Sequence, residues 1–183
     1  MSTFGDIVHR RRSCRAYDPD REIPDSVLQD CIDSARAAPS ACNRQPWHFT
    51  IVRDPEKRRT ILEKGLLPGI QHDWLYDCPC IVALSLTPNF TVHRIAPFLS
   101  KIPYHYVDAG IAGEHFILAA TEQGLGTCWV GWIREKKIRK VLHLKTAQRV
   151  VALIAAGYPR DPNFFEADTA TSRKPANEIA RWM

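Results

Sequence analysis

The sequence predicts a single globular domain in which α-helices and β-strands intermix along the whole chain. The chain has 183 residues, of which 45% are hydrophobic, and this length and composition are typical of one domain with a substantial core. Stretches with apolar residues at helical spacing are interspersed with short apolar runs of strand length. No internal repeat or low-complexity segment is found, so we expect one domain over residues 1–183.

The predicted helices either begin at a start signal or carry apolar residues on one face. One is expected to begin at residues 24–26 (Pro-Asp-Ser) and to run toward Pro39, and a second begins at residues 54–56 (Asp-Pro-Glu). A long, largely apolar helix from Val107 to Gln123 is expected to be buried on most sides. Shorter helices are expected at 4–8, at 73–76 and in the basic stretch that starts at residue 134.

Four runs of strand length are rich in β-branched, aromatic or small apolar residues. They are Trp47–Val52, Cys80–Leu86, Thr127–Ile133 and Arg149–Pro159, and the last gives the strongest strand signal. The pair of glycines at 124 and 126 resembles half of a dinucleotide-binding fingerprint. It follows a helix rather than a strand and lacks a third glycine at the required spacing, so we interpret Gly124 as a helix cap.

The segment from Ala38 to Phe49 has the features of a ligand-binding loop. The helical pattern stops at Pro39, and the small side chains of Ser40 and Ala41 allow a flat ligand to approach the backbone closely. Asn43 and Gln45 offer donors and acceptors for the edge of a heteroaromatic ring. An ordinary helix-to-strand loop has the same composition, and this interpretation stays open.

A basic cluster near the amino terminus is a second candidate site. Arg11, Arg12 and Arg15 flank Ser13 in a short run that also contains Arg10. Guanidinium groups bind phosphate through forked, charge-assisted hydrogen bonds, and a serine hydroxyl adds a donor, so the cluster suits a phosphate monoester. The alternative is the solvated basic end of a helix, which the helix dipole also favours.

Composition argues against several other classes of function. No apolar run reaches the length of a membrane span, and the amino terminus has no apolar signal core, so we expect a cytoplasmic protein that does not bind membranes. The six cysteines are expected to be thiols, and the pair Cys78 and Cys80 lacks the spacing and the second ligand pair of a zinc site, so no metal is expected.

The net charge of +5 is concentrated in residues 134–149, but no nucleic-acid recognition motif or interleaved aromatic residue accompanies this stretch. We therefore expect no nucleic-acid partner. A solvated helix face is the simplest role for the stretch, and attraction of anionic substrates such as nicotinamide nucleotides is a second one.

In the order and spacing of four motifs, the sequence resembles the nitroreductase family of FMN-dependent oxidoreductases. The motifs are RRSCRAY at 11–17, APSACNRQPW at 38–47, the block 108–132 containing GLGTCW, and SRKP at 172–175. The resemblance implies an α+β fold of three layers, with a mostly antiparallel central sheet flanked by helices. It also implies an intertwined homodimer with FMN bound at the interface.

The resemblance further assigns residues to the cofactor. Phosphate and ribityl contacts are implied for Arg11, Arg12, Ser13, Arg15 and Arg173, and contacts from the second subunit for Pro39, Ser40, Ala41 and Asn43. Trp129, Val130 and Gly131 would lie against the isoalloxazine with a backbone amide directed at N5, and Gln71 would meet its pyrimidine edge. Gln45 completes the set through its ring-edge donors and acceptors.

The implied activity is reduction of nitroaromatic, quinone or similar electron-poor acceptors by NAD(P)H. Hydride passes through flavin N5 in ping-pong turnover, so no catalytic side chain is needed. Arg15 is the candidate for stabilising negative charge at the flavin N1 and O2 edge. Residues 87–106 form either a lid over the flavin or a plain surface loop. The alternative function is a non-catalytic FMN-binding storage or sensor protein.

Overall fold

The computed structural model describes residues 3–69, 72–88, 101–166 and 173–183. Its centre is a sheet of four strands, β1 (Trp47–Val52), β2 (Cys80–Leu86), β3 (Gly126–Val130) and β4 (Arg149–Gly157). The strand order is β1-β2-β4-β3, and every neighbouring pair is antiparallel. The expected antiparallel sheet is therefore confirmed, with β1 and β3 at its two edges.

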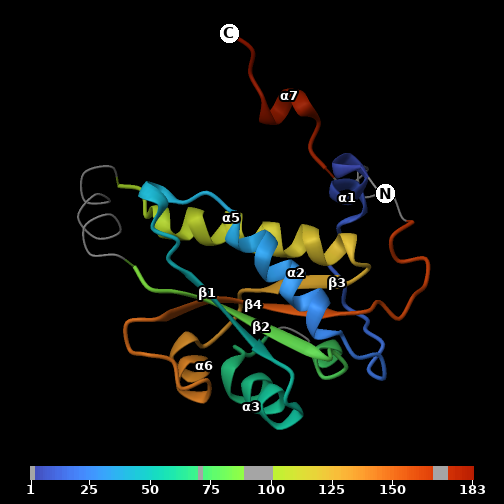
Figure 1. Cartoon of the computed structure of the whole chain (residues 1–183), viewed down its shortest axis with the longest axis vertical. Coiled ribbons are helices and arrows are strands. Elements are labelled where there is room, and N and C mark those ends of the chain that lie inside the picture. The colour runs from blue at the N-terminus through green and yellow to red at the C-terminus, as the bar shows by residue number, and fades with distance from the viewer. Residues whose placement is uncertain (1–2, 70–71, 89–100, 167–172) are drawn as a thin grey trace.

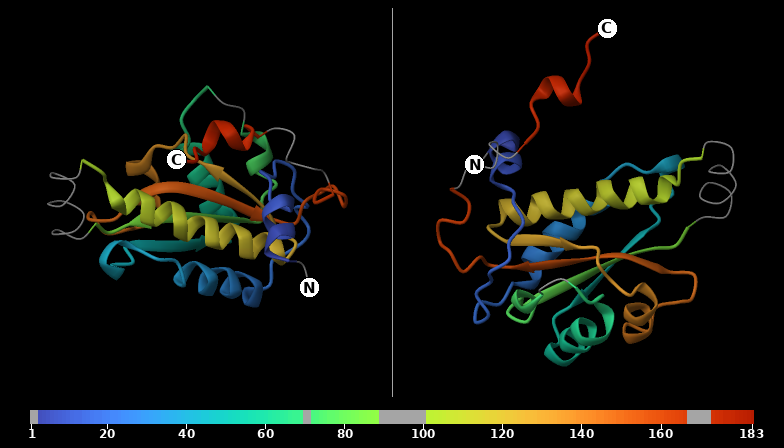
Figure 2. Two further views of the ribbon diagram at one scale, coloured as in Figure 1. Left: turned by 90° about the horizontal axis from the view of Figure 1, so that it is seen from above. Right: turned by 180° about the vertical axis from the view of Figure 1, so that it is seen from behind.

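Helices cover both faces of this sheet (Figure 1; Figure 2). Helices α2 (Asp25–Arg36) and α5 (Tyr104–Glu122) pack on one face, and α3 (Pro55–Gly65) and α6 (Glu135–Val141) pack on the other. Successive residues of a strand enter opposite cores, as Leu153 contacts the core below α3 and α6 while Ile154 contacts the core below α2 and α5. The three-layer α+β fold is thus confirmed.

The cores explain why the central strands read as continuous apolar runs. Every residue of β2 is buried, because helices cover both of its faces. The contact between α3 and α6 is close, since a Cβ atom added to Gly65 would lie 2.5 Å from Cγ1 of Ile138. The long helix α5 is apolar on most sides, as expected, and its buried residues include Phe116 and Ile117.

Several element boundaries differ from those expected. Strand β3 ends at Val130 rather than at residue 133, because the chain then turns toward α3, where Arg134 donates its N–H to the carbonyl of Gly65 at 2.7 Å. Helix α6 ends at Val141, two residues before His143, which has a φ of +51°. Helix α2 ends at Arg36, and α5 begins at Tyr104.

Two short helices lie at the ends of the described chain. In α1 (Phe4–Arg10), Thr3 and Asp6 form a reciprocal capping box. Helix α7 (Ala176–Ile179) belongs to a carboxyl-terminal segment that projects beyond the body of the molecule (Figure 1; Figure 2). Among the described residues, none of the helices combines the length and apolar character needed to cross a membrane.

Candidate functional site

The arginine segment, residues 11–15, lies beside the edge strand β3. Ser13 forms an isolated parallel bridge with Thr127, and the backbone N–H of Cys14 donates to the Thr127 carbonyl at 2.8 Å. The approach is close enough that a Cβ atom added to Gly126 would lie 2.6 Å from the Cβ atom of Cys14. Two motifs that are far apart in the sequence are thus side by side, tied by backbone hydrogen bonding.

A cavity of about 290 Å³ lies next to this junction. We call it the β3 cavity, and its wall contains Arg15 together with Trp129, Val130 and Gly131, four of the residues that the sequence assigns to the cofactor. No atom of the described residues packs within 4 Å of a Cβ atom added to Gly131, so its backbone is open to an approaching ligand. Cys128 also lines the cavity, and burial raises the pKa of its thiol, which keeps the sulfur protonated.

Three further residues that the sequence did not indicate complete the β3 cavity: His72, Trp74 and Trp132. The indole N–H of Trp132 donates to the Pro68 carbonyl at 2.9 Å, which holds the ring in place. Nε2 of His72 is buried and has no hydrogen-bond partner among the described residues. Trp132 could have been found from its position just after Gly131, whereas His72 and Trp74 reach the cavity only through tertiary packing.

The arginines of the cluster are held in different ways. The Arg12 guanidinium lies 4.2 Å from the centroid of the Phe164 ring, and Nε of Arg11 lies 3.7 Å from Oε1 of Glu114. Within the described part of the chain, Nε of Arg12 is buried and has no hydrogen-bond partner. A guanidinium that stacks on a ring keeps its edge free for planar hydrogen bonding, and a buried unpaired N–H is costly. Arg12 is therefore suited to receive an anion.

The 39–45 loop has an unusual backbone. Cys42, Asn43 and Gln45 have φ angles of +50°, +51° and +44°, a region that residues other than glycine rarely occupy. Side-chain hydrogen bonds hold this shape: Ser40 Oγ accepts from the Gln45 N–H at 2.9 Å, and the Gln45 amide donates to Asn43 Oδ1 at 2.9 Å. Such strain persists only where the surroundings enforce it, and it clusters at functional sites.

The chain does not bring this loop to the β3 cavity. The Ala41 N–H donates to Oδ1 of Asp108 at 3.0 Å, which fastens the loop to the first turns of α5. In Figure 1 the loop, drawn in blue, lies at that end of α5, whereas α1 and the arginine segment lie at the opposite end, and the reverse view in Figure 2 agrees. The two groups of predicted cofactor residues are thus separate within one chain.

The remaining residues that the sequence assigns to the cofactor lie outside the β3 cavity. Gln71 and most of the expected lid at 87–106 lie outside the described residues. Arg173 is exposed at the start of the carboxyl-terminal segment that carries α7. Pro39, the first residue of the 39–45 loop, is also exposed.

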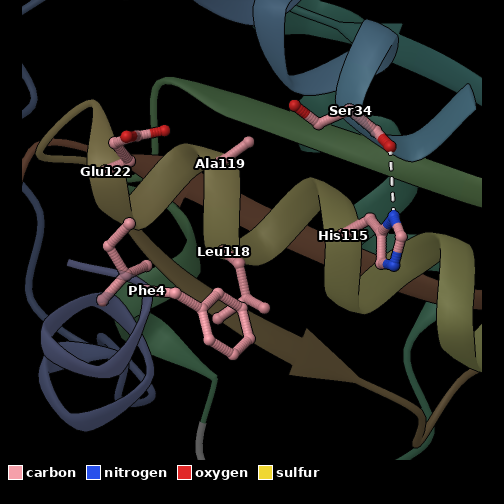
Figure 3. Close-up of a pocket in the computed structure, with 7 residues that line it drawn as sticks. Phe4, Ser34, His115, Leu118, Ala119 and Glu122 are labelled. Atoms are coloured by element: carbon pink, nitrogen blue, oxygen red, sulfur yellow. Dashed lines mark hydrogen bonds between the residues drawn. The ribbon is translucent and has the colours of Figure 1, made fainter. Parts of the chain in front are cut away.

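A second hollow is an apolar groove of about 280 Å³ between α1, α2 and α5 (Figure 3). Phe4 and Leu118 form its apolar wall, and Nδ1 of His115 lies 3.2 Å from the Ser34 carbonyl. Phe4 is 73% exposed. The wall of the groove is mostly apolar, with His115 and Glu122 as its titratable side chains.

Among the described residues, no group of three or more His, Cys, Asp or Glu side chains is arranged to hold a metal ion. All six cysteines are free.

Comparison with known proteins gives consistent matches over nearly the whole chain. The sequence pattern of the nitroreductase family matches residues 8–68 and 66–158. A protein of Archaeoglobus fulgidus, provisionally named NADH dehydrogenase/NAD(P)H nitroreductase, is 33% identical over 172 residues, which cover 88% of this chain and 89% of that protein. A similarly named protein of Methanothermobacter thermautotrophicus is 31% identical over 164 residues, 85% of this chain and 77% of its own.

Solved structures agree with these matches. A nitroreductase family protein from Clostridium novyi NT superposes with a TM-score of 0.79 at 27% identity and covers 87% of each chain. An FMN-dependent nitroreductase from Clostridium difficile R20291 has the same fold, with a TM-score of 0.74 at 23% identity and a coverage of 97% of each chain.

Proposed function

Because the chain belongs to the nitroreductase family, we propose that it is an FMN-dependent oxidoreductase that uses NAD(P)H to reduce nitroaromatic compounds, quinones or similar electron-poor acceptors. The observation that carries this proposal is the junction of the arginine segment with β3. There, Arg12 keeps a buried, unpaired Nε, and Arg15 shares one cavity with Trp129 and Gly131.

The residues at this junction fit the two ends of FMN. Arg12 provides the unpaired donor for the phosphate, with Ser13 and Arg11 beside it in the sequence. The exposed indole of Trp129 and the open backbone at Gly131 suit the flat ring system and leave an amide N–H available to it. Arg173 would add a further cation to the phosphate end.

We further propose that the complete site is formed by two copies of the chain. The 39–45 loop is preshaped but lies away from the β3 cavity of its own chain, so a second copy would supply it. Exposed apolar side chains support such an association, since Phe4 is 73% exposed and Val8 of the same helix 42%. Each chain would contribute a single domain spanning residues 1–183.

Bound FMN would supply hydride acceptance and hydride donation at its N5 atom. Arg15 would stabilise negative charge at the N1 and O2 edge of the ring, and Trp74, Trp129 and Trp132 would limit the access of water to it. Hydride transfer through the flavin requires no protein nucleophile, and burial raises the pKa of the Cys128 thiol, which disfavours its reactive thiolate. NAD(P)H and the acceptor would bind in turn at the same face. Free thiols throughout the chain suit the cytoplasm.

The test is spectroscopic and kinetic. Purified protein should be yellow with a flavin absorbance spectrum, and it should oxidise NADH or NADPH steadily once menadione is added. Colourless protein that does not take up added FMN would refute the proposal. A yellow protein without turnover on quinone or nitroaromatic acceptors would instead favour the storage or sensor function.

A further inference from the structure

A second polar cavity lies close to the β3 cavity and has no role in the function proposed above. Its volume is about 430 Å³, and we call it the basic cavity. The first turn of α5, helix α6 and the start of β4 line it with Tyr106, Glu135, Lys136, Arg139, Arg149, Val150 and Val151.

The charge of the basic cavity favours an anion. Three cations face one carboxylate, and Arg139 is already committed, since its Nη1 donates to the Thr146 carbonyl at 3.0 Å and lies 3.7 Å from Oε1 of Glu135. Lys136 and Arg149 are exposed, and neither forms an ion pair within the described ranges of the chain. Two cations therefore remain available to a ligand.

Two other groups could contact a nucleoside. Tyr106 is 46% exposed at the cavity, so its ring can stack against a planar base. Oε1 of Glu135 is buried and accepts no hydrogen bond from the described residues. A carboxylate in this state is a ready acceptor for a sugar hydroxyl.

The two cavities are neighbours along the same edge of the sheet. Val130 lines the β3 cavity and pairs with Leu153 of β4. Val151, which lines the basic cavity, lies two residues before Leu153, a rise of about 7 Å along the strand. Trp132, in the loop between β3 and α6, lines the β3 cavity, and Glu135, the first residue of α6, lines the basic cavity. A ligand longer than a flavin-sized ring could occupy both.

We propose that the basic cavity binds the adenosine end of the nicotinamide dinucleotide and that it selects NADPH over NADH. Lys136 and Arg149 bind the 2′-phosphate, the Tyr106 ring stacks on the adenine, and Glu135 accepts a hydrogen bond from the ribose. The nicotinamide end then lies against the exposed face of the flavin that the β3 cavity holds. This inference rests on the proposed function and identifies the electron donor, which the sequence leaves open.

The kinetic test removes each free cation separately. In Lys136→Gln and Arg149→Gln, KM for NADPH should rise about tenfold, the loss expected for one charge-assisted hydrogen bond, while KM for NADH and the kcat with either donor stay unchanged. Lys137→Gln is the matched control, because Lys137 is exposed on the same helix but does not line the cavity. An equal rise in KM for NADPH and NADH would overturn the assignment, and so would a rise in KM for NADPH of the same size in Lys137→Gln.

A binding measurement separates this inference from the proposed function. By calorimetry on the full-length protein with its flavin, 2′,5′-ADP should bind more tightly than 5′-AMP, and the Lys136→Gln/Arg149→Gln double variant should lose that difference. If the wild-type protein binds the two nucleotides equally or binds neither, the basic cavity is not a 2′-phosphate site. Continued oxidation of NAD(P)H with menadione by the same preparation would show that the proposed function stands without it.

Discussion

The arginine segment and the 39–45 loop are both predicted to hold the same cofactor, but the fold positions them by different means. The arginine segment is tied to β3 by backbone pairing between Ser13 and Thr127, so its place follows from the sheet. The 39–45 loop is shaped by short-range hydrogen bonds of Ser40 and Asn43 and is fastened to α5 through Asp108.

This difference indicates which half of the site one chain can complete alone. On the β3 side, Arg15 and the residues expected to contact the ring, such as Trp129 and Gly131, line a single cavity. The 39–45 loop has a preformed backbone, but it is fastened at the other end of α5, away from the β3 cavity (Figure 1). Changes on the β3 side should therefore act within a chain, and changes in the loop should act on the site of a second chain.

The largest effect is expected where the arginine segment touches β3. In Gly126→Ala, the new methyl group would meet Cys14 at 2.6 Å and push the segment away from the strand. We expect a loss of about 1–3 kcal/mol in the free energy of unfolding and a flavin that is released during purification. Urea unfolding and the ratio of flavin to protein absorbance measure the two effects.

Gly110→Ala is the matched control for this change, because in the described part of the chain no atom outside the local helix backbone lies within 4 Å of a Cβ atom added at that exposed position of α5. It should keep the flavin and gain up to about 1 kcal/mol of stability from the higher helix propensity of alanine. If Gly126→Ala behaves like Gly110→Ala, the contact between Cys14 and β3 does not position the phosphate-binding residues.

The second-largest effect is expected at Arg12, whose buried Nε has no hydrogen-bond partner among the described residues. Arg12→Gln should weaken FMN binding by roughly tenfold to a hundredfold, since one or two charge-assisted hydrogen bonds to the phosphate are lost. Quenching of flavin fluorescence on titration with apoprotein measures the dissociation constant. Arg10→Gln is the control, because Arg10 also stacks on a ring, that of Phe165, but has no unpaired buried nitrogen. Equal losses in both variants would contradict a specific role for Arg12.

The sequence predicts the elements of this fold better than their ends. Strands β1 and β2 begin and end where their apolar runs do, because β-branched and aromatic residues are bounded there by charged or turn-forming ones. The end of α6 was not predictable, since His143 takes a left-handed conformation without the glycine that normally signals it.

The candidate site divides in the same way. Arg15 and Trp129 were identified from local motifs, and the structure brings them to one cavity. His72 and Trp74 were not identified from the sequence. They reach that cavity from a separate turn, and the placement of this turn depends on packing against residues far away in the sequence. The sequence shows the basic stretch at 134–149, but only the fold shows that Lys136 and Arg149 line a common cavity while Lys137 does not.

A mixing experiment tests whether the loop acts on a second chain. Asn43→Val places a β-branched residue at a φ of +51° and removes the side-chain acceptor of the Gln45 amide, so the loop should be distorted. Alone, this variant and Arg12→Gln should each have little activity at limiting FMN. Unfolded together and refolded, they should recover about a quarter of the wild-type sites, because half of the dimers are mixed and each mixed dimer has one intact site.

Recovery depends on the two defects falling in different halves of the same site. No recovery after mixing, with both variants shown by size-exclusion chromatography to refold as dimers, would mean that the loop serves the cavity of its own chain. Mixing each variant with itself is the control and should leave its activity unchanged.

The smallest expected effect is a difference in thiol reactivity between the cysteines of the two regions. Burial raises the pKa of Cys14 and of Cys128 beside β3, whereas Cys42 in the 39–45 loop is exposed. The thiolate is the reactive form, and a raised pKa leaves less of it at a given pH. In protein stripped of its flavin, iodoacetamide should therefore modify Cys42 before Cys14 and Cys128 between about pH 7 and 9, the range around the ordinary thiol pKa. Cys14 and Cys128 should react only after the protein is unfolded. Peptide mass spectrometry against a urea-denatured control measures this order, and modification of Cys128 as fast as Cys42 in the native protein would show that the packing between the arginine segment and β3 opens readily.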